Sequence, residues 1–395
     1  MKIIASIAAT LLLISGPVFA AEPTVETPGR QAILVDANTG TVLFSKNADE
    51  PMAPSSMSKL MTAVMVFERL AAGTLKMEDT MPVSERAWRM SLNEGSTMFL
   101  KLGDRVKVED LLRGMIIASG NDACVALAEG LAGSEERFSE LMTVKGREIG
   151  LTGSVFKNSS GWPDPGHVMT ARDLAKLASY LIQTYPQYYS FYSEKQFTYG
   201  VDYRTKKPIT QGNRNPLLYK SGIGVDGLKT GHATAAGYGL TASARRDDRR
   251  LILVVNGLAS MNERSRESER LLDIGFREWD NYKILTAGTA ADTAEVWLGT
   301  KASVPLLVEK DLLLTLPRKS RAGMKATIVY DSPIPAPVRQ GAPVGRVVIT
   351  APEMATLEVP LLAGEAVERL GTGGRISAAV SHLIWGKLGN PPAKK

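Results

Sequence analysis

Residues 56–72 read SMSKLMTAVMVFERLAA, and this stretch predicts a long helix with a serine and a lysine at its start. Apolar residues recur along it at helical spacing, and Gly73 follows as a residue that commonly ends helices. Ser56 and Lys59 lie one turn apart on the same helix face. A serine hydroxyl attacks a carbonyl carbon when a base is within hydrogen-bond reach, and a neutral lysine is such a base. Taken alone, the pattern is better explained by Ser56, or its neighbour Ser55, capping the helix and Lys59 pointing into solvent.

A second string, Ser119-Gly120-Asn121, lies between two predicted helices. The Ser119 hydroxyl can relay a proton, and the Asn121 amide can both donate to and accept from a peptide backbone. The alternative is that Asn121 merely caps the following helix.

A third string, Lys229-Thr230-Gly231, begins a predicted strand. Lys229 and Thr230 there can bind a carboxylate, and Gly231 is expected to let a ligand approach the backbone closely. Burial and the charge of Lys229 would both lower the pKa of Lys59, as a lysine base requires.

The order of predicted elements indicates an α+β domain in which one antiparallel sheet is covered by helices. A hairpin comes first, helices follow, and three strands and a closing helix come last. The segments are 31–36 and 41–46 (hairpin), 56–72, 108–118, 122–132 and 172–185 (helices), 226–232, 238–244 and 251–258 (strands) and 263–279 (closing helix).

After residue 282 the sequence changes to short strand-like runs separated by Gly, Pro and charged residues. No helical periodicity intervenes, which predicts a small all-β sandwich. We therefore expect a first domain over 21–283 and a second over 284–371.

Both ends of the chain carry segments predicted to act outside these domains. Lys2, an apolar run over 3–14 and Ala20 have the form of a secretory signal peptide covering 1–20. Residues 372–395 are predicted to form a glycine-rich spacer and an amphipathic helix too short to span a bilayer core of about 30 Å, which suits a helix lying in the membrane interface. Docking of this helix on the protein itself or on a partner is the alternative. Its apolar positions are Ile376, Ala379, Val380, Leu383, Ile384 and Leu388.

Composition narrows the function classes further. Cys124 is the single cysteine, so no intrachain disulfide is possible, and its apolar surroundings predict a core residue. The formal net charge of +6 is mild, and the basic residues are scattered, which argues against a nucleic-acid partner. His167, His232 and His382 are isolated from one another, so no zinc site is predicted. Neither a metal nor a cofactor is expected.

Together the three strings give the chain a resemblance to the D-alanyl-D-alanine carboxypeptidases, the low-molecular-mass penicillin-binding proteins of the type-5 class. The trio is typical of penicillin-recognising serine enzymes. The resemblance also rests on the whole boxes 54–59 and 226–232, the β-rich second domain and the tail. It implies a β-lactamase/transpeptidase-like fold for the first domain. Gly120 stands where the Ser-Asp-Asn form has an aspartate.

The resemblance implies a role for each residue of the trio. Ser56 would be the acylated nucleophile, Lys59 its base, and Ser119 the group that passes a proton to the departing D-alanine. Backbone N–H groups of Ser56 and His232 would form the oxyanion hole. Substrate-binding roles are implied for Asn121, Lys229, Thr230, Gly231, His232, Arg214 and Arg264, with plain surface charge as the alternative for the two arginines.

The activity implied is removal of the terminal D-alanine from peptidoglycan pentapeptides, with β-lactam antibiotics as covalent inhibitors. Alternatives using the same site are a D,D-endopeptidase and a β-lactamase; an inactive cell-wall-binding protein is a further alternative. No Glu-x-x-Leu-Asn string is present, which disfavours a class A β-lactamase. The expected location is the periplasm, peripherally attached to the outer face of the cytoplasmic membrane.

Overall fold

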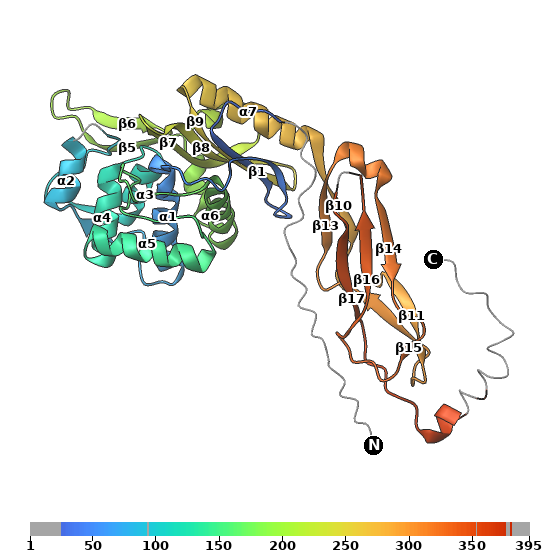
Figure 1. Cartoon of the computed structure of the whole chain (residues 1–395). Helices are drawn as coiled ribbons and strands as arrows, with labels where there is room; N and C mark the ends of the chain where they lie inside the picture. Colours follow the sequence, from blue (N-terminus) through green and yellow to red (C-terminus); the bar gives the residue numbers. More distant parts are fainter. Residues whose placement is uncertain (1–24, 93–94, 353, 377–379, 381–395) are drawn as a thin grey trace, which may run out of the picture. The chain divides into compact units, whose positions relative to one another are not determined.

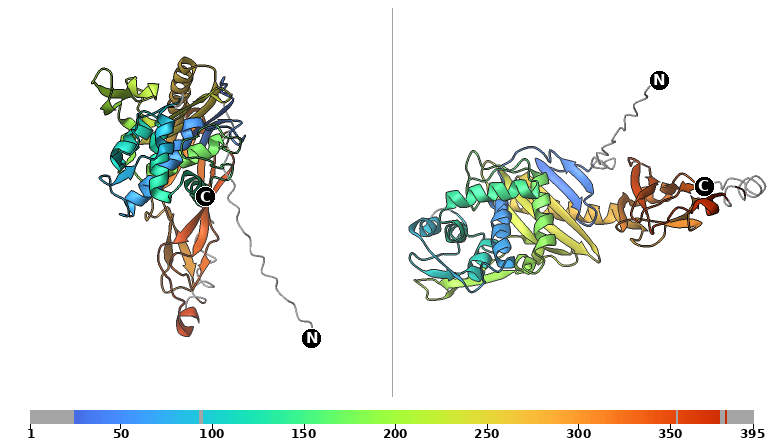
Figure 2. Two further views of the ribbon diagram at one scale, coloured as in Figure 1. Left: turned by 90° about the vertical axis from the view of Figure 1, so that its left-hand side faces the viewer. Right: turned by 90° about the horizontal axis from the view of Figure 1, so that it is seen from below.

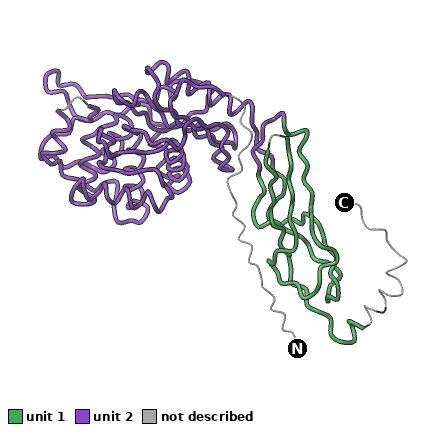
Figure 3. Tube along the Cα trace, viewed as in Figure 1, with its two compact units in different colours: residues 1–21, 283–313, 320–395 green, residues 22–282, 314–319 purple. Residues whose placement is uncertain are grey.

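The computed structural model describes residues 25–92, 95–352, 354–376 and 380. The chain divides into two compact units, which Figure 3 shows in separate colours. The larger unit comprises residues 22–282 and 314–319, and the smaller comprises 283–313 and 320–395. The predicted signal peptide, 1–20, lies outside the described residues.

The larger unit is built on a five-stranded antiparallel sheet (Figure 1). Successive side chains of a strand point to opposite faces, and both faces of this sheet are buried. On β1, Ile33 and Val35 enter one core while Ala32 and Leu34 enter the other. The strand order is β2 (Val42–Lys46), β1 (Gln31–Asp36), β9 (Arg249–Leu258), β8 (Gly237–Arg246) and β7 (Val225–Ala233).

Helices cover both faces of this sheet (Figures 1 and 2). One core contains side chains from most of the helices and from Ile252 and Val254 of β9. The opposite core contains Leu271, Leu272 and Phe276 of the last helix. The helices on the first side are α1 (Lys59–Ala71), α3 (Val108–Ile116), α4 (Asn121–Ala132), α5 (Glu135–Ile149) and α6 (Ala171–Thr184), and α7 (Met261–Glu278) covers the second.

The predicted α+β fold is confirmed, and the structure corrects three points. The helix predicted from residue 56 is a 3₁₀ turn, η1 (Ser55–Ser58), followed by α1. The helices α2 (Glu85–Leu92) and α5 were not predicted from the sequence, and neither was the hairpin of β5 (Gln196–Val201) and β6 (Pro208–Gly212). Shorter elements of this unit are β3 (Thr80–Pro82), β4 (Arg105–Lys107), η2 (Tyr189–Ser193) and η3 (Pro216–Tyr219).

The smaller unit is all-β, as predicted. Its strands form one six-stranded order, β14-β16-β17-β12-β11-β15. Their bounds are β11 (Asp292–Trp297), β12 (Ser303–Leu307), β14 (Lys325–Val329), β15 (Ile334–Pro335), β16 (Pro343–Thr350) and β17 (Leu357–Ala363), with a 3₁₀ turn η4 (Arg318–Gly323). The strands β10 (Trp279–Leu285) and β13 (Leu312–Pro317) pair with each other. One boundary between the two units falls within each of these strands, and another falls within η4.

The end of the chain departs from the prediction in one respect. Residues 372–376 are helical, and the Arg375 N–H donates to the Gly371 carbonyl at 3.0 Å, so the glycines expected to form a spacer already belong to a helical turn. Ile376 and Val380 are exposed, and the remaining predicted apolar positions lie outside the described residues. No helix within the described ranges is long and apolar enough to cross a membrane.

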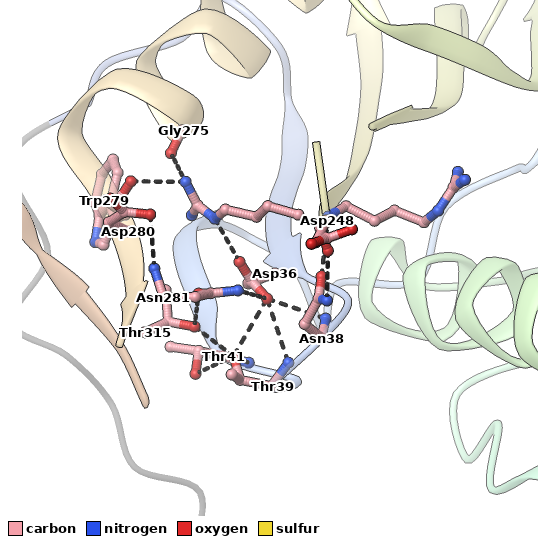
Figure 4. A network of polar contacts seen from close by, with 12 residues as sticks. Asp36, Asn38, Thr39, Thr41, Asp248, Gly275, Trp279, Asp280, Asn281 and Thr315 are labelled. Carbon is pink, nitrogen blue, oxygen red and sulfur yellow. Dashed lines mark hydrogen bonds and ion pairs between the residues drawn. The ribbon is translucent and has the colours of Figure 1, made fainter. Parts of the chain in front are cut away.

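A buried ion pair links the last residue of β1 to the first residue of β9 (Figure 4). Arg249 Nε donates to Asp36 Oδ2 at 2.7 Å, and the two side chains are 10% and 0% exposed. The second carboxylate oxygen accepts the N–H groups of Asn38 and Thr39 and the Asn281 amide. The guanidinium also donates to backbone carbonyls of residues 275 and 279. This network joins β1, β9 and β10.

We expect Asp36→Asn to destabilise the larger unit by about 3–5 kcal/mol, because it leaves Arg249 buried without its counter-charge. Urea unfolding followed by circular dichroism measures the change. The control is Asp49→Asn, which breaks an ion pair with Arg172 in which the carboxylate is 71% exposed. That loss should be under about 1 kcal/mol. Equal losses in the two variants would contradict the importance of burial.

Candidate active site

The turn that precedes α1 presents a serine beside a buried lysine. Ser56 lies in η1 and is partly exposed, whereas Lys59, the first residue of α1, is 1% exposed. Lys59 Nζ lies 2.9 Å from Ser56 Oγ. Neither η1 nor α1 has a side-chain cap, so the simple explanation of Ser56 as a helix cap is wrong.

Two further oxygens hold the Lys59 amine. Its Nζ donates to Asn121 Oδ1 and to the Ser160 carbonyl, both at 2.7 Å. When the amine is neutral it has two N–H bonds, which these two oxygens satisfy, and its lone pair is then free to accept the Ser56 hydroxyl proton. Burial, with a smaller contribution from the charge of Arg214, lowers the pKa of Lys59 to about 8. The geometry and the lowered pKa both suit a general base.

The second and third strings together form another serine–lysine pair. Lys229 Nζ donates to Ser119 Oγ at 3.0 Å, and both residues are 2% exposed. Burial lowers the pKa of Lys229 well below its ordinary value, and the positive charges of Lys59 and Arg214 add to this effect. Two lysines with lowered pKa values therefore lie beside two serine hydroxyls.

Local backbone geometry explains the residues of the Ser119-Gly120-Asn121 string. Ser119 has φ of +64°, a left-handed conformation that costs a non-glycine residue about 1–3 kcal/mol. A Cβ at Gly120 would lie 2.7 Å from Asp122 Oδ1. The Asp122 carboxylate therefore occupies the space that a side chain at position 120 would need. Asn121 is the first residue of α4, whose N-cap is Gly120, so Asn121 does not cap that helix but binds Lys59.

The third string lies on β7, and its glycine has an unexpected neighbour. Thr230 is 6% exposed and lines the cleft described below. A Cβ at Gly231 would lie 2.9 Å from the Pro54 carbonyl oxygen and 3.1 Å from Met57 Cγ. The missing side chain therefore lets β7 pack against the turn that carries Ser56.

A cleft of about 830 Å³ brings the three strings together. Of the residues predicted for the site, it is lined by Ser56, Ser119, Asn121, Thr230, Gly231, His232, Arg214 and Arg264. The rest of its wall comes from Gly95, Ser96, Gly161, Trp162, Pro163, Ala233, Thr234, Tyr238 and Met261. None of these described lining residues is acidic, whereas two are arginines, so the cleft suits an anionic ligand.

The two predicted arginines and His232 differ in their surroundings. Arg264 is 5% exposed, burial lowers its pKa to about 10, and its Nε has no hydrogen-bond partner among the described residues. Such a buried guanidinium in a cleft wall is suited to a carboxylate. Arg214 Nε donates to the Ala118 carbonyl at 3.0 Å, which ties it to the Ser119 turn. His232 is exposed, and its ring stacks on Tyr238 with centroids 4.0 Å apart.

A loop that sequence reasoning did not assign residue by residue supports Lys59. Asn158 Oδ1 accepts the N–H groups of Ser160, Gly161 and Trp162, at 3.2, 2.8 and 3.0 Å. Glu135, 5% exposed, accepts both the N–H and the hydroxyl of the residue before Ser160. The loop thereby presents the Ser160 carbonyl to Lys59. A backbone acceptor has no residue-type signature, so no sequence pattern could have identified it.

Asp122 supports the opposite wall. It is fully buried and accepts hydrogen bonds from the Thr97 hydroxyl at 2.6 Å and from the N–H groups of Met98 and Leu100. The segment it holds leads from Gly95 into α3. The charge of Asp122 at the start of the mostly apolar stretch 122–132 was the available signal.

Within the part of the chain that the structure describes, no group of three or more His, Cys, Asp or Glu side chains is placed to hold a metal ion. Cys124 is fully buried, its thiol contacts the Gly120 carbonyl at 3.2 Å, and burial raises its pKa to about 12. This buried position agrees with the prediction that Cys124 is a core residue.

Comparison with known families matches two segments of the chain. Residues 18–260 match the family described as D-alanyl-D-alanine carboxypeptidase, peptidase S11. Residues 279–369 match the penicillin-binding protein 5 C-terminal domain.

Individual relatives span most of the chain. The D-alanyl-D-alanine carboxypeptidase DacC of Escherichia coli is 40% identical over 375 residues, covering 93% of this chain and 92% of its own. DacF of Bacillus subtilis is 34% identical over 346 residues, covering 87% and 86%.

Solved structures of similar proteins include penicillin-binding protein 5 of Haemophilus influenzae, with a TM-score of 0.79 and 35% identity over 88% of this chain and 99% of that one. Penicillin-binding protein D2 of Listeria monocytogenes in its ampicillin-bound form has a TM-score of 0.57 and 28% identity, covering 65% of this chain and 100% of that one.

Proposed function

The chain belongs to the D-alanyl-D-alanine carboxypeptidases of peptidase family S11, and from that premise we propose how its residues divide the reaction. It is a serine-type carboxypeptidase that removes the terminal D-alanine from peptidoglycan peptides and binds β-lactams. We assign Ser56 as the nucleophile and Lys59 as its base. The observation that carries the assignment is the buried Lys59 amine 2.9 Å from Ser56 Oγ, with two carbonyl oxygens for its remaining N–H bonds.

Before acylation, Thr230, Lys229 and Arg264 bind the terminal carboxylate of the peptide. Neutral Lys59 takes the Ser56 proton, and the Ser56 oxygen forms a bond to the penultimate carbonyl carbon. We propose that the N–H groups of Ser56 and His232 stabilise the negative oxygen of the tetrahedral intermediate. Asn121 and the part of β7 that lines the cleft, at Gly231, would hold the peptide backbone.

Release of D-alanine requires a proton on the leaving nitrogen. Ser119 donates its hydroxyl proton as the carbon–nitrogen bond breaks, and Lys229, 3.0 Å away, returns a proton to it. The proton that Lys59 took from Ser56 is then lost to solvent and Lys229 regains one from solvent, so both lysines return to their starting states. Water attacks the ester carbon, Lys59 accepts the water's proton and passes it to the Ser56 oxygen as the ester bond breaks, and the tetrapeptide leaves with Ser56 restored. In this scheme Arg214 holds the Ser119 turn through the Ala118 carbonyl.

The direct test is to incubate the mature protein with a purified muropeptide pentapeptide and weigh the products. Loss of one alanine supports the proposal. Cleavage of cross-linked dimers alone would favour the D,D-endopeptidase, which uses the same site. An intact pentapeptide together with rapid penicillin hydrolysis would favour a β-lactamase.

We expect Thr230→Val to lower kcat/KM on a D-Ala-D-Ala peptide by about 10- to 100-fold, since a hydrogen bond to a charged group is worth about 1.5–3 kcal/mol. A thioester substrate without the terminal carboxylate should lose much less. Thr198→Val, an exposed change on β5, is the matched control. Equal losses on both substrates would mean that Thr230 supports the fold and not carboxylate recognition.

We further propose that the enzyme is exported to the periplasm by cleavage after residue 20 and attaches peripherally to the outer face of the cytoplasmic membrane. On this proposal the catalytic domain covers 21–283, the all-β domain 284–371 and the membrane-binding segment 372–395. Support comes from the exposed Ile376 and Val380 on the described part of the tail. The lysines at 387, 394 and 395 would add attraction to anionic lipid.

A chain ending at Gly374 should therefore stay active on a small peptide and keep its melting temperature, but lose binding to anionic vesicles in a flotation assay. The full-length protein should float with the vesicles, and less at high salt because salt screens the lysines. A truncated chain that floats as well as the full-length one would place the membrane contact elsewhere. One that unfolds would show that the tail belongs to the core.

A further inference from the structure

The loop that supports Lys59, residues 157–167, is hydrogen-bonded to α1 at two points and to the catalytic turn η1 at a third. The Ser160 carbonyl accepts from Lys59 at 2.7 Å, and the Ser159 carbonyl accepts from the Thr62 hydroxyl of α1 at 2.5 Å. The third contact joins His167 Nε2 to Ser58 Oγ at 2.7 Å. Ser58 is fully buried and lies directly before Lys59 in the chain, so this contact reaches the turn itself.

The tautomer of His167 follows from its other partner. The Lys157 N–H donates to Nδ1 at 3.2 Å, so Nδ1 carries no proton and Nε2–H donates to Ser58 Oγ. His167 is 3% exposed, and burial lowers its pKa to about 4. The charged groups acting on it are Asp164 in its own loop and Lys59 on α1. The imidazole therefore stays neutral, with both nitrogens bonded, throughout the pH range above about 5.

We propose that His167 is a positioning residue, which locks the 157–167 loop to the Ser58 turn so that the Ser160 carbonyl holds Lys59 Nζ against the Ser56 hydroxyl. The inference rests on the base role proposed for Lys59. Asn158 shapes the loop internally and Glu135 ties it to α5, whereas His167 sets its distance from the catalytic turn.

Releasing this contact has a chemical consequence beyond stability. If the loop moves away from the turn, the Lys59 amine loses an acceptor and gains contact with water. Its pKa then rises toward the ordinary lysine value of 10.5, and a smaller fraction is neutral at a given pH. The other groups that act on Lys59, namely Cys124, Arg214, Asp122 and Glu135, lie outside this loop. A shift of the pH midpoint of acylation to higher pH therefore reports increased solvation of the Lys59 amine.

The experiment measures acylation by fluorescent penicillin between pH 5.5 and 10 in His167→Ala and His167→Gln. We expect His167→Ala to acylate about 10- to 100-fold more slowly at pH 7, because small displacements of a catalytic group cost up to about 10²-fold. Its pH midpoint should rise by about one unit or more. Glutamine can accept from the Lys157 N–H and donate to Ser58, so His167→Gln should stay within about threefold of wild type.

Ser58→Ala tests the contact from the other side and should slow acylation in the same direction. The double variant with His167→Ala should lose little more than the worse single variant, as expected for two residues that share one interaction. Ser154→Ala is the matched control. It removes a buried hydroxyl that donates to Asp173 at 2.7 Å, and this hydrogen bond does not involve the catalytic turn. The control should change thermal stability without moving the pH midpoint.

Two results would overturn the inference. One is a His167→Ala variant that acylates within about threefold of wild type. The other is a loss that matches the unfolded fraction, with the pH midpoint unchanged. Wild-type protein in the same series tests the proposed function separately: a normal Ser56 adduct together with either result overturns only the role of His167, whereas no adduct on Ser56 overturns both.

Discussion

Ser56→Ala is expected to abolish both penicillin labelling and D-alanine release. Removal of a serine nucleophile from a hydrolase that works through an acyl-enzyme costs on the order of 10⁶-fold in kcat. The buried Lys59 amine would then have no hydroxyl to deprotonate. Intact-mass measurement after penicillin treatment should find the adduct on wild-type protein and none on the variant.

Ser55→Ala is the matched control for this prediction. The two serines are adjacent, but Ser55 is 6% exposed and its hydroxyl has no hydrogen-bond partner among the described residues. A hydroxyl without a base is not activated, so Ser55→Ala should keep labelling. An adduct of equal yield on Ser56→Ala would show that another residue is acylated.

Lys59→Met should reduce acylation by about 10²–10⁴-fold, the usual contribution of a general base. Methionine has similar length and suits the buried position, so the fold should be retained. The pH profile gives an independent check. A lysine with a pKa of about 8 is neutral in about one molecule in ten at pH 7. Because the neutral form is the active one, acylation by wild-type protein should rise with pH through about 8 and then level off.

The control for Lys59→Met is Lys176→Met, an exposed lysine on α6 that donates to the Gly150 carbonyl. It should leave both the rate and the profile unchanged. If Lys59→Met retains activity within threefold of wild type, the base is elsewhere, and Lys229 would be the next residue to replace.

The trio of motifs and the pattern of strands and helices were sufficient to predict the α+β domain and the all-β domain. They were also sufficient to select residues that the fold brings into one cleft. The first of these residues along the chain is Ser56 and the last is Arg264. Motifs succeed here because the chemistry needs particular side chains at fixed spacing.

What the sequence could not show is how those side chains are held. The Ser160 carbonyl acts through the backbone, and His167 lies 109 positions from its partner Ser58. Gly231 was expected to admit a ligand, but its neighbour is the turn around Pro54. Each of these depends on segments distant in sequence meeting in space, for which no local pattern exists.

The cleft wall without a carboxylate has a consequence for resistance to antibiotics. In the scheme above Lys59 activates the water that breaks an ester on Ser56, and none of the described lining residues is an Asp or Glu that could act as a second base. The neighbouring Glu135 is committed to Ser159 and Arg86. Faster hydrolysis of a β-lactam ester would therefore need either a change at Lys59 or a new acidic side chain in the cleft wall. A change at Lys59 would also slow acylation by the natural peptide, because the same amine lies 2.9 Å from Ser56 Oγ and serves both steps.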